Sequence, residues 1–284
     1  MKLAVIGSGS AGNCVVLGSK KTGYWLVDAG LSAKQIRVRL EAIGVSLSCL
    51  RGIFLTHEHK DHIGGLKVLL KKLSVPVYAS VMTQEYLVSQ LQLEARWILF
   101  EPGQRFLVGP LEVDAVRIPH DATDPVGFIF HYEQRRMAVM TDLGYASESL
   151  IERLKGVEVL YLEANYDIEL LELDQKRPWS IKQRIASRHG HLSNDQALEV
   201  TQALMPTGLR EVAYGHLSRD CNTPDCLHAL IGPSCEGLQY HVSTQAEVTP
   251  WLTLISEPPK VAPSPRPASS PLPDSASWEQ PSLF

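Results

Sequence analysis

The sequence has little that would indicate a secreted, disulfide-stabilised or membrane protein. Its five cysteines are odd in number and scattered, at positions 14, 49, 221, 226 and 235, which is typical of a reducing compartment. Cys221 and Cys226 have no second cysteine pair that would complete a metal site. The apolar stretch at the start, Leu3–Ile6, is too short for a signal peptide or a membrane span. We therefore predict a cytoplasmic protein with no membrane partner.

The chain also lacks a strong charge of either sign. Its 27 Lys and Arg and its 31 Asp and Glu give a net charge of −4. The overall field therefore gives no reason to expect a nucleic-acid partner, and any such binding has to come from a local basic patch. With 284 residues, 44% of them hydrophobic, the chain is long enough for one large domain with a full core.

Apolar patterning predicts two sets of strands, each followed by helices. Strands are expected at about residues 3–6, 14–17, 24–28, 53–55, 75–79, 111–118, 127–132, 137–140, 157–162 and 211–214, and helices at about 33–43, 65–72, 83–91, 147–154, 180–187, 194–204 and 224–231. This order predicts an α/β protein of the αββα sandwich type over residues 1–255, with two sheets face to face and helices outside. Residues 256–284, rich in proline, are predicted to be a disordered tail.

The segment from Thr56 to Gly65 carries most of the chemical information. Within six positions, after an apolar run that predicts a strand, lie four good metal ligands: His57, His59, Asp61 and His62. A loop at the C-terminal end of a strand is a usual place for chemistry in layered α/β proteins. One ion cannot easily use four ligands so closely spaced, whereas two neighbouring ions can.

Three further candidates follow predicted strands elsewhere in the chain: His120, Asp142 and His216. Each alone is more often a capping or core residue, but three at strand ends in a chain with the first motif favour a shared site. Asp28, also at a strand end, is predicted either to orient the first motif through hydrogen bonds or to be a turn residue.

The pattern His-x-His-x-Asp-His at positions 57–62 resembles the signature of the metallo-β-lactamase superfamily. The resemblance implies two divalent metal ions as cofactors, and the ligand types suit Zn²⁺ or Mn²⁺. It assigns His57, His59 and His120 to one ion, Asp61, His62 and His216 to the other, and Asp142 to a bridging position. True β-lactamases commonly have a Cys at the position of Asp142, which argues against lactamase activity.

The sequences Glu-Ala-Asn at 163–165 and His-Leu-Ser at 191–193 resemble paired motifs of the tRNase Z and cyclic phosphodiesterase branch. In that branch a Glu orients a His that protonates the leaving oxygen. The resemblance therefore implies His191 as general acid and Glu163 as its partner, and Asp61 completes the predicted catalytic set. Alternatively, His191 only precedes a helix that is capped by Ser193.

Together with a Gly/Ser loop at residues 7–14, these motifs resemble the YycJ/WalJ group, bacterial proteins regarded as DNA-processing nucleases, over about residues 1–255. The 21 residues between His120 and Asp142 are too few for the tRNA-clamping arm of tRNase Z. Substrate contacts are predicted in the Gly/Ser loop, in a basic stretch around Trp179 and after the last ligand: Ser8, Ser10, Asn13, Lys182, Arg184, Arg188 and Ser218. A plain hairpin and a solvated helix face are the alternatives for the loop and the basic stretch.

The function predicted from these residues is that of a dinuclear-metal phosphodiesterase acting on nucleic acid, specifically a DNA exonuclease in replication or repair. The alternatives are a small-molecule hydrolase of the glyoxalase II or lactonase kind, an RNA-processing nuclease, and a catalytically silent scaffold. The sequence is compatible with Zn²⁺ and with Mn²⁺, with an exonuclease and with an endonuclease, and with cleavage from the 5′ or from the 3′ end.

The last five residues resemble the short peptide with which bacterial replication and repair proteins bind the DNA sliding clamp. In such a peptide a Leu-Phe pair enters an apolar pocket while a Gln makes a polar contact at its edge. We predict clamp binding through Gln280, Leu283 and Phe284, which favours DNA as the substrate.

Overall fold

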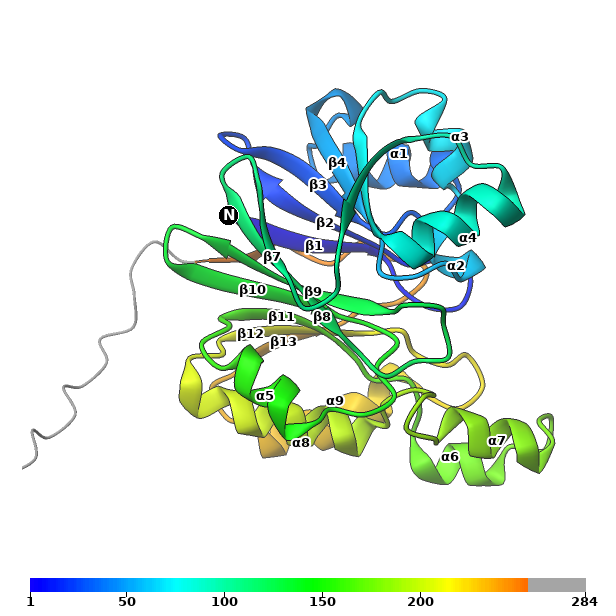
Figure 1. Ribbon diagram of the computed structural model, residues 1–284. Coiled ribbons are helices and arrows are strands. Elements are labelled where there is room, and N and C mark those ends of the chain that lie inside the picture. The colour runs from blue at the N-terminus through cyan, green and yellow to red at the C-terminus, as the bar shows by residue number, and fades with distance from the viewer. Residues whose placement is uncertain (255–284) are drawn as a thin grey trace, which may run out of the picture. The chain divides into compact units, whose positions relative to one another are not determined.

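Two seven-stranded β-sheets pack face to face in the computed structural model, which describes residues 1–254 (Figure 1). The first sheet has the spatial order β14 (Leu252–Thr253), β1 (Lys2–Gly7), β2 (Cys14–Ser19), β3 (Gly23–Val27), β4 (Leu50–Phe54), β5 (Pro76–Ser80) and β6 (Arg96–Phe100). The second has the order β13 (Gln239–Val242), β12 (Glu211–Gly215), β11 (Val159–Glu163), β10 (Arg135–Met140), β9 (Val126–Tyr132), β8 (Leu111–Arg117) and β7 (Arg105–Val108).

Helices cover the outer faces of both sheets. Over the first sheet lie α1 (Ala33–Ala42), α3 (Leu66–Leu70) and α4 (Val81–Leu91), and over the second lie α5 (Glu148–Leu154), α8 (Asn194–Leu204) and α9 (Pro224–Ser234) (Figure 1). Shorter helices are α2 (Lys60–Ile63), α6 (Ile168–Leu173) and α7 (Trp179–Ile185), with 3₁₀ turns at Leu47–Cys49 and Met205–Thr207. The predicted αββα sandwich is confirmed.

Apolar side chains on both faces of the central strands hold these layers together. Between the sheets, the ring centroid of Phe54 lies 5.3 Å from that of Phe128 and 5.2 Å from that of Phe130. On the outer side of the first sheet, Ile36 and Leu40 of α1 are fully buried against the strands. Burial on both faces gives a strand a nearly continuous apolar sequence, which is why these strands were predictable.

Strand direction brings the polar candidates to one edge of each sheet. β3 and β4 are parallel, and so are β10, β11 and β12, while β8 runs in the same direction as β10 because both are antiparallel to β9. Residues that follow these strands therefore emerge at a common edge. Three of them, Asp28, Asp142 and His216, have left-handed backbone conformations with φ of 62°, 52° and 58°. Such strain costs free energy in a non-glycine residue and is concentrated at functional sites.

Within residues 1–254, six helices and strands were not predicted from the sequence: β6, β7, β13, β14, α2 and α6. Most side chains of β6 are exposed, so its sequence shows no alternation of buried and exposed residues. The prediction of a disordered tail and of a clamp-binding peptide concerns residues that lie outside those described. Within residues 1–254, which form one compact unit, no helix is long and apolar enough to cross a membrane.

Candidate metal centre and active site

Asp28, at the end of β3, fixes the loop that follows β4. Its carboxylate accepts hydrogen bonds from Thr56 N at 2.9 Å, from Thr56 Oγ1 at 2.8 Å and from His62 Nδ1 at 2.7 Å. The carboxylate is buried, and its three donors lie at the two ends of the ligand loop. Asp28 therefore orients the first motif, one of the two roles that the sequence left open.

Close backbone packing fixes the position of Asp61 in the same loop. Asp61 O accepts a hydrogen bond from Asn13 N at 2.7 Å, and Asn13 Nδ2 donates to Asp61 Oδ2 at 3.1 Å. Gly30 packs so tightly beside this contact that a Cβ atom there would lie 1.6 Å from Asp61 O. Only glycine allows this approach, so Gly30 is required for the position of Asp61.

Four histidines each use one ring nitrogen to contact the protein. His57 Nδ1 donates to Thr56 Oγ1 at 3.0 Å, His62 Nδ1 to Asp28 Oδ2, His120 Nδ1 to Gly190 O at 3.1 Å, and His216 Nδ1 to Glu163 Oε1 at 2.7 Å. Such hydrogen bonds fix the tautomer and the ring orientation of metal-binding histidines. In each ring, Nε2 is the nitrogen left to bind an ion.

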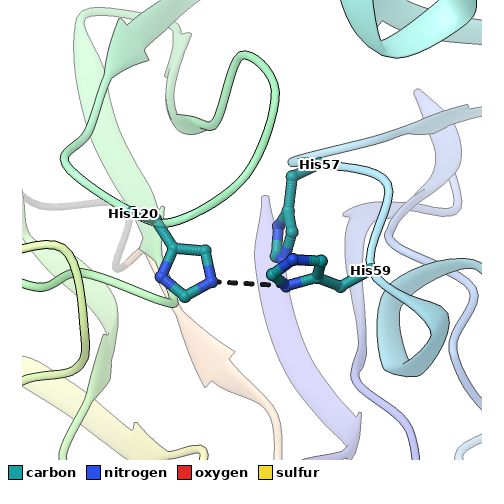
Figure 2. Close-up of side chains that lie close together, drawn as sticks. All are labelled: His57, His59 and His120. Carbon is teal, nitrogen blue, oxygen red and sulfur yellow. Dashed lines mark hydrogen bonds between the residues drawn. The ribbon is translucent and has the colours of Figure 1, made fainter. Parts of the chain in front are cut away.

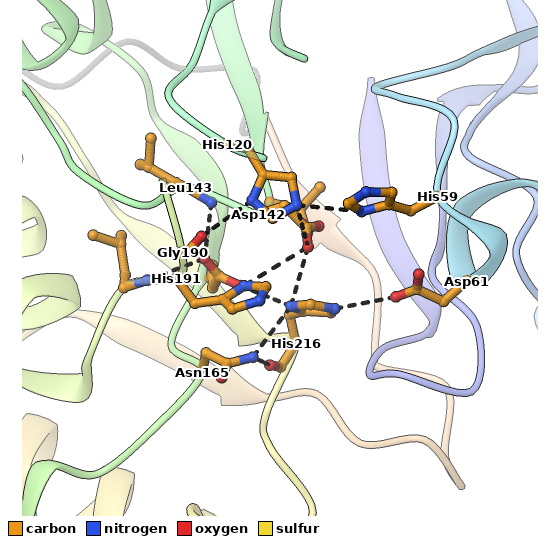
Figure 3. A network of polar contacts seen from close by, with 12 residues as sticks. His59, Asp61, His120, Asp142, Leu143, Asn165, Gly190, His191 and His216 are labelled. Carbon is orange, nitrogen blue, oxygen red and sulfur yellow. Dashed lines mark hydrogen bonds and ion pairs between the residues drawn. The ribbon is translucent and has the colours of Figure 1, made fainter. Parts of the chain in front are cut away.

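These nitrogen atoms and the carboxylates gather in two neighbouring clusters. The possible ligand atoms of His57, His59 and His120 lie within 4.8 Å of one another (Figure 2), and so do those of Asp61, His62 and His216. Asp142 contacts both clusters. Its Oδ2 lies 3.0 Å from His62 Nε2, and its Oδ1 lies 3.7 Å from His120 Nε2 (Figure 3). The seven residues named from the sequence as ligands are thus brought together.

Glu163, at the end of β11, is completely buried and contacts four donors. Its Oε1 accepts hydrogen bonds from His191 Nδ1 and His216 Nδ1, each at 2.7 Å, and its Oε2 accepts from the backbone N–H groups of Leu143 at 2.8 Å and Leu192 at 3.1 Å (Figure 3). One carboxylate oxygen therefore orients both a candidate ligand and the candidate acid.

Burial and charge shift the pKa values within this cluster. Burial lowers the pKa of His62, but Asp142 and Asp28 outweigh it and raise the pKa well above its usual value. Burial also opposes protonation of His216, yet Asp142 and its hydrogen-bond partners raise the pKa of His216 to about 10. Burial raises the pKa of Asp142, while His216 and His62 lower it well below its usual range. The buried carboxylates thus favour positive charge at this place.

The donor set fits divalent metal ions. His57 Nε2 is buried and has no hydrogen-bond partner within residues 1–254, a costly state for a polar atom unless it binds an ion. A cation would also compensate the buried carboxylates, which raise the pKa values of His62 and His216. Imidazole nitrogens together with carboxylate oxygens suit both Zn²⁺ and Mn²⁺.

An open pocket of about 430 Å³ lies over the cluster. Besides five of the seven candidate ligands and His191, its lining includes Ser10, Ser218, Arg177, Arg184 and Arg219. Arginine guanidinium groups and hydroxyls are common partners of phosphate oxygens. Three of the predicted substrate contacts, Ser10, Arg184 and Ser218, therefore lie where a substrate would bind.

The predicted role of Ser8 and Asn13 is corrected by their burial. Ser8 Oγ accepts a hydrogen bond from His216 N at 2.6 Å and contacts Tyr161 OH at 3.0 Å. Asn13 uses its side chain for Asp61 and for Gly9 N, which donates to its Oδ1 at 2.8 Å. Both side chains support the ligand residues and do not line the pocket, because the Gly/Ser loop folds back onto the ligand loop.

Lys182 and Arg188 also do not line this pocket. The guanidinium carbon of Arg188 lies 4.4 Å from the ring centroid of Tyr145, and Lys182 lines a neighbouring apolar pocket. Asp121 and Asn165 are among the pocket residues that had no predicted role. Asp121 forms an ion pair with Arg184, and Asn165 Nδ2 donates to His216 O at 2.6 Å. Their positions in the sequence could have indicated them, because Asp121 directly follows His120 and Asn165 lies two residues after Glu163.

Comparison with known proteins agrees with this geometry. The family described as "Beta-lactamase superfamily domain" matches residues 24–212. The protein named exodeoxyribonuclease YycJ from Bacillus anthracis is 33% identical over 251 residues, which cover 87% of this chain and 94% of the relative. The chain belongs to the YycJ/WalJ group of the metallo-β-lactamase superfamily. It is thus a metallo-β-lactamase-fold hydrolase, and this fold implies divalent metal ions.

Solved structures show the same fold at low sequence identity. The metallo-β-lactamase fold protein YhfI from Bacillus subtilis has a TM-score of 0.65 with this YycJ/WalJ-group chain, at 18% identity, covering 88% of this chain and 99% of that one. The short form of human tRNase Z has a TM-score of 0.62 at 17% identity, covering 88% and 99%. At these identities the likeness concerns the fold alone.

Proposed function

We propose that this chain is a dinuclear-metal phosphodiesterase that degrades DNA as an exonuclease in replication or repair in the cytoplasm. The name of its relative from Bacillus anthracis supports this proposal. The observation that carries it is the 2.7 Å hydrogen bond between His191 Nδ1 and Glu163 Oε1 beside the ligand cluster. Cleavage of a phosphodiester releases a strongly basic sugar oxygen, which needs a proton donor, whereas the thiolate released from a thioester does not.

The ligand residues would divide between two ions as follows. His57, His59 and His120 would hold one ion, Asp61, His62 and His216 the other, and Asp142 would contact both. Bound divalent ions lower the pKa of water and neutralise charge on phosphate oxygens. Arg184 and Arg219, which line the pocket, would bind further phosphate oxygens and hold the strand in place.

His191 would act as the general acid. Because Glu163 holds its Nδ1, its Nε2 is the nitrogen that can reach a substrate in the pocket that His191 lines. The buried Glu163 carboxylate stabilises the imidazolium cation before the proton leaves Nε2 for the departing oxygen. Glu163 itself contacts no substrate, so its role is to position His191.

A panel of substrates separates this proposal from its alternatives. Metal-loaded protein is incubated with end-labelled single- and double-stranded DNA, with RNA, with bis(p-nitrophenyl) phosphate and with a glutathione thioester. We expect stepwise shortening of DNA and hydrolysis of the chromogenic phosphodiester. Faster degradation of RNA than of DNA would support the RNA-processing alternative. Hydrolysis of the thioester alone would support the glyoxalase II kind.

The general-acid role of His191 is tested by substitution. We expect His191→Ala to lower kcat by about 10²–10⁴-fold without loss of metal, because general acids contribute about that factor. His59→Ala and Asp142→Ala should abolish hydrolysis together with metal binding. The exposed neighbour His189 provides the matched control, so His189→Ala should leave kcat and metal content unchanged. An unchanged kcat in His191→Ala would exclude the assignment.

We also propose that Gln280, Leu283 and Phe284, outside the described residues, tether the enzyme to the bacterial sliding clamp. Such a short peptide binds weakly, so its effect would be to raise the local concentration of the enzyme on DNA. The test is a titration of the clamp with the full chain and with its Leu283→Ala, Phe284→Ala variant. We expect the variant to lose binding, and equal binding by both chains would refute the tether.

A further inference from the structure

Helices α6 and α7 form a hairpin that leads from Glu163 to His191. Figure 1 shows the two helices side by side at a corner of the molecule, beyond the faces of the sheets. A small apolar cluster of Tyr166, Leu171 and Cys221 anchors the hairpin to the domain. Its far end is part of the active site, because Ile185 O accepts a hydrogen bond from His191 N at 2.9 Å. A ligand that binds the hairpin is therefore held close to the candidate acid.

The hairpin exposes an aromatic side chain beside an apolar pocket. Trp179, the first residue of α7, is 67% exposed. A second pocket of about 260 Å³ lies between the two helices, and its lining includes Trp179, Tyr166, Leu171 and Lys182. Large exposed apolar groups at a concave surface mark binding sites. The indole face and the pocket offer a flat apolar group a place to bind.

The same segment carries the positive charge that the chain as a whole lacks. Residues 175–190 contain five Lys and Arg and no Asp or Glu. Arg184 is exposed and pairs with Asp121, whereas Arg177 is largely covered and pairs with both Asp220 and Asp174. Exposed ion pairs contribute about 1 kcal/mol or less, so a phosphate group can replace the Asp121 carboxylate beside Arg184 at little cost.

Helix α7 separates the two pockets and contributes to both. Ile181 and Arg184 line the catalytic pocket, whereas Trp179 and Lys182 line the apolar one. An α-helix with its side chains is about 10–12 Å wide. A nucleic-acid strand advances about 3.4 Å per stacked nucleotide. A strand that enters the catalytic pocket therefore reaches Trp179 after about three or four nucleotides.

We propose that α7 is a platform for unpaired nucleotides of the substrate strand, with a base stacked on Trp179 and the phosphates contacting Arg184 and Lys182. This inference rests on the proposed nuclease function and specifies its substrate as a strand with a single-stranded segment. A base within a duplex has both faces covered by its neighbours, so only an unpaired base can stack on the indole. Positive charge next to an exposed aromatic ring is the usual composition of single-strand binding surfaces.

Binding without hydrolysis provides the first test. The full chain is titrated against a fluorescent 12-nucleotide single strand in a chelator, and anisotropy gives the Kd. We expect Trp179→Ala to raise the Kd by about 5- to 150-fold, the usual effect of removing one stacking partner. Trp179→Phe, which keeps an aromatic face, should stay within a few-fold of the wild type. Leu173→Ala, on the same hairpin and 74% exposed, should leave the Kd unchanged.

The length dependence of KM provides the second test. In the metal-loaded enzyme, Trp179→Ala should raise KM for the 12-nucleotide strand at least about fivefold more than KM for a dinucleotide, which is too short to reach Trp179. An equal Kd for Trp179→Ala and wild type, or an equal effect on a blunt duplex and a single strand, would overturn the platform. Either result would leave the proposed function intact, because that function is tested separately by the wild-type enzyme on DNA, RNA and the thioester.

Discussion

A single oxygen atom, Oε1 of Glu163, is shared by a candidate metal ligand and a candidate acid. It accepts from His191 and from His216, while the other oxygen accepts from backbone N–H groups. Replacing the carboxylate by an amide removes its charge and one acceptor oxygen. The remaining oxygen can face either the two imidazoles or the two backbone N–H groups, so the contacts that fix the orientation of both imidazoles would be weakened.

We therefore expect Glu163→Gln to differ from His191→Ala in its effect on metal binding. Hydrolysis should fall in both variants, but only Glu163→Gln should lower metal affinity, by about 10–100-fold, as is usual when a group that orients a ligand is changed. Competition with a chromogenic chelator measures the affinity, and a pH–rate profile measures the proton transfer. Unchanged metal affinity in Glu163→Gln would mean that Glu163 acts through His191 alone.

The close backbone packing between the segment after β3 and helix α2 depends on one glycine, Gly30. A Cβ at Gly30 would lie 1.6 Å from Asp61 O, and this atom also accepts from Asn13 N. We expect Gly30→Ala to displace the ligand loop, to lower the free energy of unfolding by about 1–3 kcal/mol and to weaken metal binding. Gly232→Ala in α9, where the nearest atom is 3.4 Å away, is the control and should preserve both. Urea denaturation and the chelator assay measure the two effects.

The sequence predicted the strands that are buried on both faces and the residues that follow them. Strands such as β10 and β12 read as apolar runs that end just before Asp142 and His216. The edge strand β6 escaped prediction because its exposed side chains follow no two-residue alternation. Ser8 was assigned to the substrate because its burial depends on His216, which is 208 residues away in the chain. Spacing along the sequence carries no information on such a contact.

The metal site belongs to the sandwich as a whole, because both sheets contribute to it. The residues after β3 and β4 come from the first sheet, and those after β8, β10, β11 and β12 come from the second. Ions bound here would connect the two sheets. Whatever binds the folded state and not the unfolded chain raises the free energy of unfolding.

Metal removal should therefore lower the melting temperature of the protein. At a free metal concentration 100-fold above Kd, binding adds about 2.7 kcal/mol, which corresponds to about 5–10 °C for a domain of this size. Differential scanning calorimetry of metal-loaded and chelator-treated protein measures the shift, and Asp142→Ala should show none. A melting temperature independent of metal in the wild type would contradict the two-sheet site.

The distribution of the ligands along the chain has a consequence for folding kinetics. His57 and His216 are separated by more than half of the sequence, and neither sheet alone supplies a complete set. The long loops between these residues must close before an ion can bind all of its ligands. Metal binding would therefore not speed the early steps of folding. A bound ion would instead lower the rate of unfolding of the native state. Bound ions would therefore stabilise this fold only after the apolar strands have packed together.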